Sequence, residues 1–345
     1  MYRIRQSIFI IIIMIGFSNS LFSKEVRDAG IGWQVLIDES AKLFKDGKYK
    51  EAVSISEEAL KVAIENANSN HGDITLSLNN LAVLYDKLGQ YNKIETLYKQ
   101  ALKILEKKYD SNNTEVAQIL NNFGGYYFSV GKNIKAEKLL KQALKIRKET
   151  LGLEHLDVAI SLSSLAEVYK DQGLFKKSAH LFKHALKILE KKLGSNNIKI
   201  AQVLNNFSAI YIIKGNYEKA RPLCERSLKI TEHILGSEHP EIVIILNNLA
   251  RIYEKQNNYE EAEIYYKRSV SIVEKSLGFE HPRFGAALQN LGVFYHNRGK
   301  YDKAKKLYKR AFEILEKSLG SEHPRTQMIV RILDHLDKEI QTAEI

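Results

Sequence analysis

Pairs of side-chain amides recur along the chain at a regular interval. Each amide offers hydrogen-bond donors and an acceptor, so a row of amides on one surface could hold an extended peptide backbone without reading its side chains. Arg251 and Lys255 lie one helical turn apart beside such a pair and would suit a carboxylate or another anion. The candidate binding residues are therefore Asn79, Asn80, Asn121, Asn122, Asn205, Asn206, Asn247, Asn248, Arg251, Lys255 and Asn290.

The same amides have a second possible role, because they could bond neighbouring helices to one another. Ser163 and Ser164 interrupt the row, and Gln289 stands beside Asn290 in its last member. The sequence leaves both roles open.

Other residue types that often perform chemistry are placed unfavourably for it. The histidines His155, His239, His281 and His323 each lie in a different connector between repeats. Helices stacked about 8–10 Å apart would hold them too far from one another to share a metal ion, so we expect helix caps. Cys224, the single cysteine, falls in a core column and is not expected to act as a nucleophile. We expect no active site, no metal and no cofactor.

All of these residues lie on a repeat with a step of 42 residues, marked by Tyr85, Tyr127, Tyr169, Tyr211, Tyr253 and Tyr295. Within a step, apolar residues spaced i, i+3, i+4, i+7 predict two helices. A turn glycine follows the first helix in five steps, and Asn257 stands in the place of a sixth. Both residue types accept the left-handed backbone that ends a helix. Such a pair leaves apolar surface on both sides, so it is stable only when stacked between neighbours.

This helix-turn-helix, with small residues at its close contacts, resembles the tetratricopeptide repeat. The step of 42 residues, the NNLA-type start and the LGxEHP connector, as in LGSEHP from Leu235 and LGFEHP from Leu277, are similar to the kinesin-light-chain-like subclass. The resemblance implies an all-α, right-handed α-solenoid of about seven repeats. It further implies that the first helices line a concave groove that grips a peptide or partner domain, and that the protein is not an enzyme.

We assign residues 1–20 to a signal peptide, 21–33 to a lead-in, 34–326 to the repeats and 327–345 to a capping helix and tail. The repeats span about 34–75, 76–116, 117–158, 159–200, 201–242, 243–284 and 285–326. Two connectors depart from the pattern, YDSNN from Tyr109 and LGSNN from Leu193, and we expect the groove to differ there. Residues 101–123 closely match residues 185–207, which indicates duplication of a two-repeat block.

The formal net charge of +11 permits several kinds of partner. Much of the charge forms a stripe on the second helices, with Lys99, Lys103, Lys141, Lys145, Lys183 and Lys187 among its members. A solvated outer face is the default interpretation, and contact with an anionic membrane or wall polymer is the alternative. No basic motif interleaved with aromatic residues occurs, so we expect no nucleic acid partner. We expect a monomer that binds a protein or peptide.

The N-terminus differs from everything after it. Arg3 and Arg5 precede an apolar run from Ile8 to Phe17, and small residues follow as far as Ser20. This is the arrangement of a signal peptide in bacterial style, and the run is shorter than the roughly 20 residues that a membrane span needs. We expect a periplasmic or secreted protein, with an N-terminal membrane anchor as the alternative. A cell-envelope assembly factor and a secreted host-directed effector are alternative functions.

Export makes a direct prediction about the mature protein. Cleavage after Ser20 would leave a chain that begins near Leu21. N-terminal sequencing of protein isolated from its native cells should find that start. Recovery of folded protein that still begins at Met1 would refute cleavage.

Overall fold

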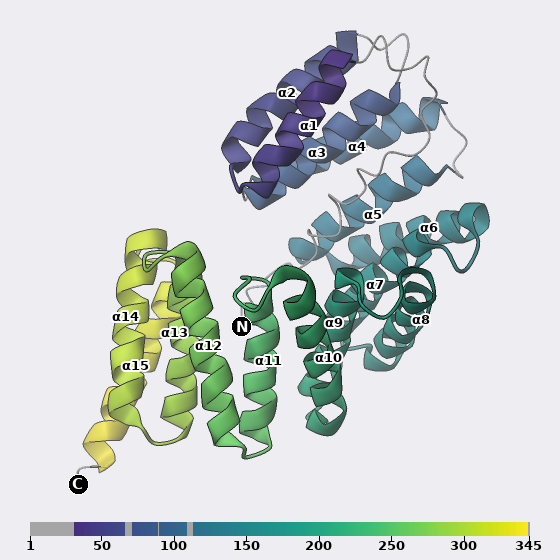
Figure 1. The fold of residues 1–345 in the computed structure, drawn as a ribbon. Coiled ribbons are helices and arrows are strands. Elements are labelled where there is room, and N and C mark those ends of the chain that lie inside the picture. The colour runs from purple at the N-terminus through teal and green to yellow at the C-terminus, as the bar shows by residue number, and fades with distance from the viewer. Residues whose placement is uncertain (1–30, 66–70, 89, 109–112, 344–345) are drawn as a thin grey trace. The chain divides into compact units, whose positions relative to one another are not determined.

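The computed structural model describes residues 31–65, 71–88, 90–108 and 113–343, so the expected signal peptide lies outside it. Every regular element in the described residues is an α-helix (Figure 1). In chain order the helices are α1 (Ile31–Lys45), α2 (Tyr49–Glu65), α3 (His71–Lys87), α4 (Tyr91–Lys108), α5 (Thr114–Ser129), α6 (Asn133–Leu151), α7 (Leu156–Asp171), α8 (Phe175–Leu193), α9 (Ile198–Ile213), α10 (Tyr217–Leu235), α11 (Ile242–Lys255), α12 (Tyr259–Leu277), α13 (Pro282–Asn297), α14 (Tyr301–Leu319) and α15 (Pro324–Ala343).

The chain divides into two compact units, Met1–Lys192 and Leu193–Ile345. In its described part the first unit contains the pairs α1/α2, α3/α4, α5/α6 and α7/α8, and the second contains α9/α10, α11/α12, α13/α14 and then α15. Within each unit the second helix of a pair packs on the first helix of the next pair. The predicted all-α architecture of stacked helix pairs is confirmed.

Small residues allow the helices to approach closely. The column Ala52, Ala136, Ser178, Ala220, Ala262 and Ala304 is fully buried. At two positions even a methyl group has no room. A Cβ on Gly124 would lie 2.7 Å from Cγ of Leu140, and a Cβ on Gly292 would lie 2.7 Å from Cε1 of Tyr308. Real Cβ atoms do not approach neighbours this closely, so these glycines set the spacing within their pairs.

In the turns that the structure describes in full, a left-handed residue stands between the two helices of a pair, as the sequence predicts. Asn257 has φ 62°, close to the φ of 70° at Gly215 and 68° at Gly299. Asparagine is one of the few residues with a side chain that adopts this backbone routinely. The predicted replacement of the turn glycine by Asn257 is confirmed.

The connector histidines cap helices, which confirms their predicted role. His155, His239, His281 and His323 each accept a hydrogen bond at Nδ1 from the backbone N–H two residues later, at 3.1–3.2 Å. The two divergent connectors perform the same task with asparagine. Oδ1 of Asn113 accepts from the N–H of Glu115 at 2.6 Å, and Oδ1 of Asn197 accepts from that of Lys199 at 3.0 Å. The SNN sequences therefore preserve the cap at the start of the next helix.

Polar contacts also join one pair to the next. The hydroxyl of Tyr295 donates to Glu263 at 2.7 Å, and the equivalent bonds Tyr85–Glu57, Tyr169–Glu137 and Tyr253–Glu225 recur in other pairs. A connector glutamate is contacted by a lysine 37 residues later in Glu154–Lys191, Glu238–Lys275 and Glu280–Lys317. These ion pairs are exposed to solvent, so they add little to the stability of the fold.

None of the helices in the described part of the chain is both long enough and apolar enough to cross a membrane.

The cap at His281 predicts a pH effect with a definite sign. Burial, and to a lesser extent Arg283, lowers the pKa of His281 below its ordinary value of 6.5. The folded protein therefore binds this proton less readily than the unfolded chain does. The contribution of the cap is present above about pH 6.5 and is lost as the pH falls through the lowered pKa of the folded state.

His281→Asn should keep the cap and remove its titration, since asparagine performs this role at Asn113 and Asn197. We expect its melting temperature to match that of the wild type at about pH 7.5 and to fall less by about pH 5.5. His281→Ala, the matched control, should lose about 1 kcal/mol at neutral pH. Equal falls in the wild type and His281→Asn would contradict the titration.

Candidate ligand-binding face

The candidate binding residues all lie on the first helix of a pair, and we call the side of each unit formed by these helices the first-helix face. Asn79 and Asn80 lie on α3, Asn121 and Asn122 on α5, Asn205 and Asn206 on α9, Asn247, Asn248, Arg251 and Lys255 on α11, and Asn290 on α13. Burial divides them into three groups. Asn79, Asn121, Asn122, Asn205 and Asn206 are buried, Asn80, Asn247 and Asn248 are half-buried, and Arg251, Lys255 and Asn290 are exposed.

In the first unit an amide–amide hydrogen bond joins α5 to α3. Nδ2 of Asn122 donates to Oδ1 of Asn79 at 2.6 Å, and both side chains are buried. We call such a bond between neighbouring first helices an amide rung. Oδ1 of Asn122 also accepts from Nε2 of Gln118 at 3.0 Å. Here the structure shows the helix-bonding role that the sequence left open, and contact with a ligand stays a prediction.

This network continues to Arg147 of α6, a residue that the sequence analysis missed. Its guanidinium donates to Oε1 of Gln118 at 2.5 Å, to Oγ of Ser161 at 2.8 Å and to the backbone oxygen of Asp157 at 3.1 Å. Ser161 in turn donates to Oδ1 of Asn121 at 3.2 Å. Burial lowers the pKa of the Arg147 guanidinium, against the opposing effect of the Asp157 carboxylate.

A signal for Arg147 was present in the sequence. The equivalent positions one step away on either side are Leu105 and Leu189, so an arginine interrupts an apolar column. Only 1% of its surface is exposed. A buried charge persists where hydrogen bonds satisfy it, which Gln118 and Ser161 provide. Arg147 therefore belongs to the interior of the first unit and is not available to a ligand.

In the second unit an amide rung is found beside a different amide contact. Nδ2 of Asn248 donates to Oδ1 of Asn205 at 2.8 Å, which joins α11 to α9. Oδ1 of Asn247 instead accepts from Oγ of Ser269 on α12 at 3.1 Å. The amides of this unit are thus partly committed to contacts within the fold.

Exposed residues on the first-helix face of the second unit offer a surface to a ligand. Arg251, Lys255 and Asn290 are accompanied by the exposed apolar side chains of Val293 on α13 and Met328 on α15. No acidic side chain in the described part of the chain forms an ion pair with Arg251 or Lys255. The surface therefore combines two unneutralised cations, an amide and apolar contact area.

The outer lysine stripe is different, because carboxylates neutralise part of it. Lys99, Lys141 and Lys267 each pair with a glutamate one turn earlier, at 2.6–2.8 Å. The hydrogen bond from Lys141 is the largest of the effects that lower the pKa of Glu137, and Lys267 does the same for Glu263. The positive electrostatic potential along the stripe is therefore weaker than the number of its lysines alone indicates.

Cys224 occupies the core position predicted for it. It is fully buried on α10, and its Sγ donates to Oγ of Ser208 at 2.9 Å. Burial raises the pKa of this thiol to about 11. This shift favours the protonated thiol at neutral pH, the less reactive form.

Comparison with known proteins identifies the class. The sequence profile of the tetratricopeptide repeat family matches residues 42–107, 115–191 and 199–275, and a second profile of the family matches residues 285–325. The chain belongs to the tetratricopeptide repeat family and is built as a protein-interaction scaffold. No curated protein matches its sequence significantly.

Solved structures show which kinds of tetratricopeptide repeat protein this chain resembles. A putative kinesin light chain from Podosopora anserina with nearly identical TPR-like repeats is 26% identical, with a TM-score of 0.52 over 60% of this chain and 98% of that one. BtubC (BKLC) from P. vanneervenii is 23% identical, with a TM-score of 0.58 over 67% and 92%. A Rap protein complexed with Competence and Sporulation Factor is 19% identical, with a TM-score of 0.59 over 88% and 87%. The predicted likeness to kinesin-light-chain repeats is confirmed.

The amide rungs predict different costs for two asparagines at equivalent positions. Asn122→Ala would leave the buried oxygen of Asn79 without its donor, and should cost about 1–3 kcal/mol of unfolding free energy. Asn290→Ala, at an exposed position, should change stability by less than about 0.5 kcal/mol. Urea denaturation followed by circular dichroism measures both. Equal losses in the two variants would show that the rung does not stabilise the fold.

Proposed function

We propose that this protein is a non-enzymatic scaffold that binds an extended peptide segment or partner domain on its first-helix face. The observation that carries the proposal is the exposed surface of the second unit, where Arg251 and Lys255 lie one turn apart on α11. Membership of the tetratricopeptide repeat family supports the general role.

The two cations favour an anionic group on the ligand. Arg251 can bind a carboxylate through two parallel hydrogen bonds, and Lys255 adds a second positive charge within reach. Both side chains are exposed, and neither forms an ion pair in the described part of the chain. An acidic side chain or a C-terminal carboxylate would therefore find a partner here without displacing an internal one.

The neighbouring residues favour a peptide over a small anion. Asn290 has a donor and an acceptor for a peptide backbone, and Val293 and Met328 provide apolar contact for side chains. A surface that mixes amides, cations and apolar groups along successive first helices suits a chain with alternating polar and apolar groups. The Rap structure contains a bound factor in a similar fold, which supports ligand binding by analogy of fold alone.

The other roles derived from the sequence stay as alternatives. Export, proposed from residues 1–20, would place the binding face outside the cytoplasm, where an envelope-assembly factor or a secreted effector would also act. Carboxylates pair with Lys99, Lys141 and Lys267, so the structure does not strengthen the case for the lysine stripe as the main contact surface.

The test compares two charge-matched double variants. A linear peptide selected from a random display library provides the probe, and fluorescence polarisation measures its affinity. Arg251→Ala with Lys255→Ala should weaken binding at least about ten-fold, a loss of roughly 1.4 kcal/mol, because the ligand anion loses both partners. Amidation of an acidic or C-terminal group on the peptide should produce a similar loss in the wild type.

The matched control is Lys183→Ala with Lys187→Ala, which removes the same charge from exposed positions one turn apart on α8. It should leave affinity nearly unchanged. Equal weakening by the two double variants would show that general charge or the stripe governs binding. Unchanged affinity in the α11 variant, with an unchanged melting temperature, would rule out this surface as the site.

A further inference from the structure

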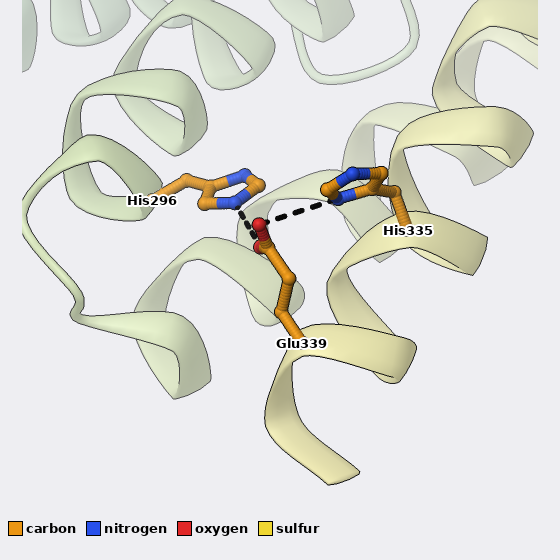
Figure 2. Close-up of side chains that lie close together, drawn as sticks. All are labelled: His296, His335 and Glu339. Atoms are coloured by element: carbon orange, nitrogen blue, oxygen red, sulfur yellow. Dashed lines mark hydrogen bonds and ion pairs between the residues drawn. The ribbon is translucent and has the colours of Figure 1, made fainter. Parts of the chain in front are cut away.

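Three potential metal ligands meet where α15 packs on the last helix pair. His296 is near the end of α13, and His335 and Glu339 lie one turn apart on α15. Figure 2 shows the carboxylate of Glu339 between the two imidazole rings. We propose that these residues form a site for a divalent transition-metal ion, with Zn²⁺ the best fit. This inference does not depend on the peptide-binding proposal.

The geometry brings one ligand atom from each residue to a common point. Nε2 of His296 lies 2.6 Å from one oxygen of Glu339, and Nδ1 of His335 lies 3.4 Å from the other. The three ligand atoms all lie within 4.8 Å of one another. Tetrahedral zinc with bonds of about 2.0–2.1 Å separates its ligand atoms by about 3.3 Å, so only small side-chain shifts are needed to admit the ion.

The cluster at α15 differs from the contacts that other first helices make at equivalent positions, because it has a third potential ligand. The pair His296–Glu339 repeats a polar contact made one step earlier by Asn297 and Glu254, at 2.9 Å. In that earlier contact the position of His335 is occupied by Val293. In the first unit Ser129 and Asp86 make the corresponding contact at 3.5 Å, and Gly125 occupies that position. The third ligand occurs at α15 and at neither of these two contacts.

The donor set selects the class of metal. Two imidazole nitrogens and one carboxylate oxygen suit Zn²⁺, whereas Ca²⁺ and Mg²⁺ prefer oxygen ligands alone. The rings of Tyr301 and Tyr308 contact the His296 ring edge-on, with centroids 5.7 and 6.3 Å away, and hold its orientation. His335 is exposed, with 69% of its side chain accessible, so an ion can enter and keep water or a ligand oxygen in a fourth position.

The ion would connect α13 to α15 directly. Apolar packing already holds α15 through the buried side chains of Ile329 and Leu336. A bound metal would add a bond from His335 and Glu339 to the preceding repeat, and so stabilise the C-terminal end of the second unit. Its binding should therefore raise the melting temperature of that unit.

Calorimetric titration of ZnCl₂ into chelator-treated protein that carries no polyhistidine tag tests the site. The wild type should bind one ion with high affinity, and Co²⁺ in its place should give the visible absorption of a tetrahedral complex. His335→Ala, an exposed substitution, should weaken binding at least about ten-fold while leaving the His296–Glu339 contact in place. Glu339→Gln should weaken it similarly.

A second histidine pair provides the matched control. His180 and His184 are also one turn apart on a helix, α8, but in the described part of the chain no third ligand residue forms a cluster with them. His180→Ala should leave zinc affinity unchanged. Zinc binding that survives both His335→Ala and Glu339→Gln, or that is absent from the folded wild type, would overturn the proposal.

Discussion

Within each of the two units, a helix pair that lies between two others buries apolar side chains on two opposite sides, and this need for a neighbour governs the rest of the structure. Fully buried small residues such as Ala136 and Ala262 bring the two helices of a pair together. Gly124 and Gly292 lack the Cβ atom that would clash with the second helix of their pair. The ends of the row must then be modified. Glu39 stands exposed on α1, and α15 covers the last pair while turning a polar side outward.

Polar contacts between pairs follow from the same stacking. The tyrosine–glutamate bonds, the connector ion pairs and the amide rungs each reach from one pair to the next. They are individually weak, apart from those that are buried, but they fix the register in which apolar surfaces meet. Where the apolar column is broken, as at Arg147, polar groups at Gln118 and Ser161 satisfy the intruding charge.

The architecture could be predicted from the sequence because its determinants recur at a fixed step. The left-handed Asn257 and the caps at His155 and His281 follow from their places in the repeat. Exposure of the asparagines could not be predicted in this way. Helical periodicity places Asn122 away from the core of its own pair, yet the neighbouring first helix covers it, and it is only 2% exposed. The cluster at Glu339 was also missed, because His296 and His335 are far apart in sequence and belong to the end of the row.

The caps of the connectors have a consequence for how such a chain changes length. His239 and Asn197 each supply one side-chain acceptor to the backbone N–H two residues later. Either residue type can therefore cap the first turn of the next helix. The start of the next helix at such a junction is set by one acceptor, whichever residue supplies it. A repeat that is added or removed at a connector would therefore leave the cap of the following helix in place. The close match of residues 101–123 with 185–207 indicates that the chain grew by such a step.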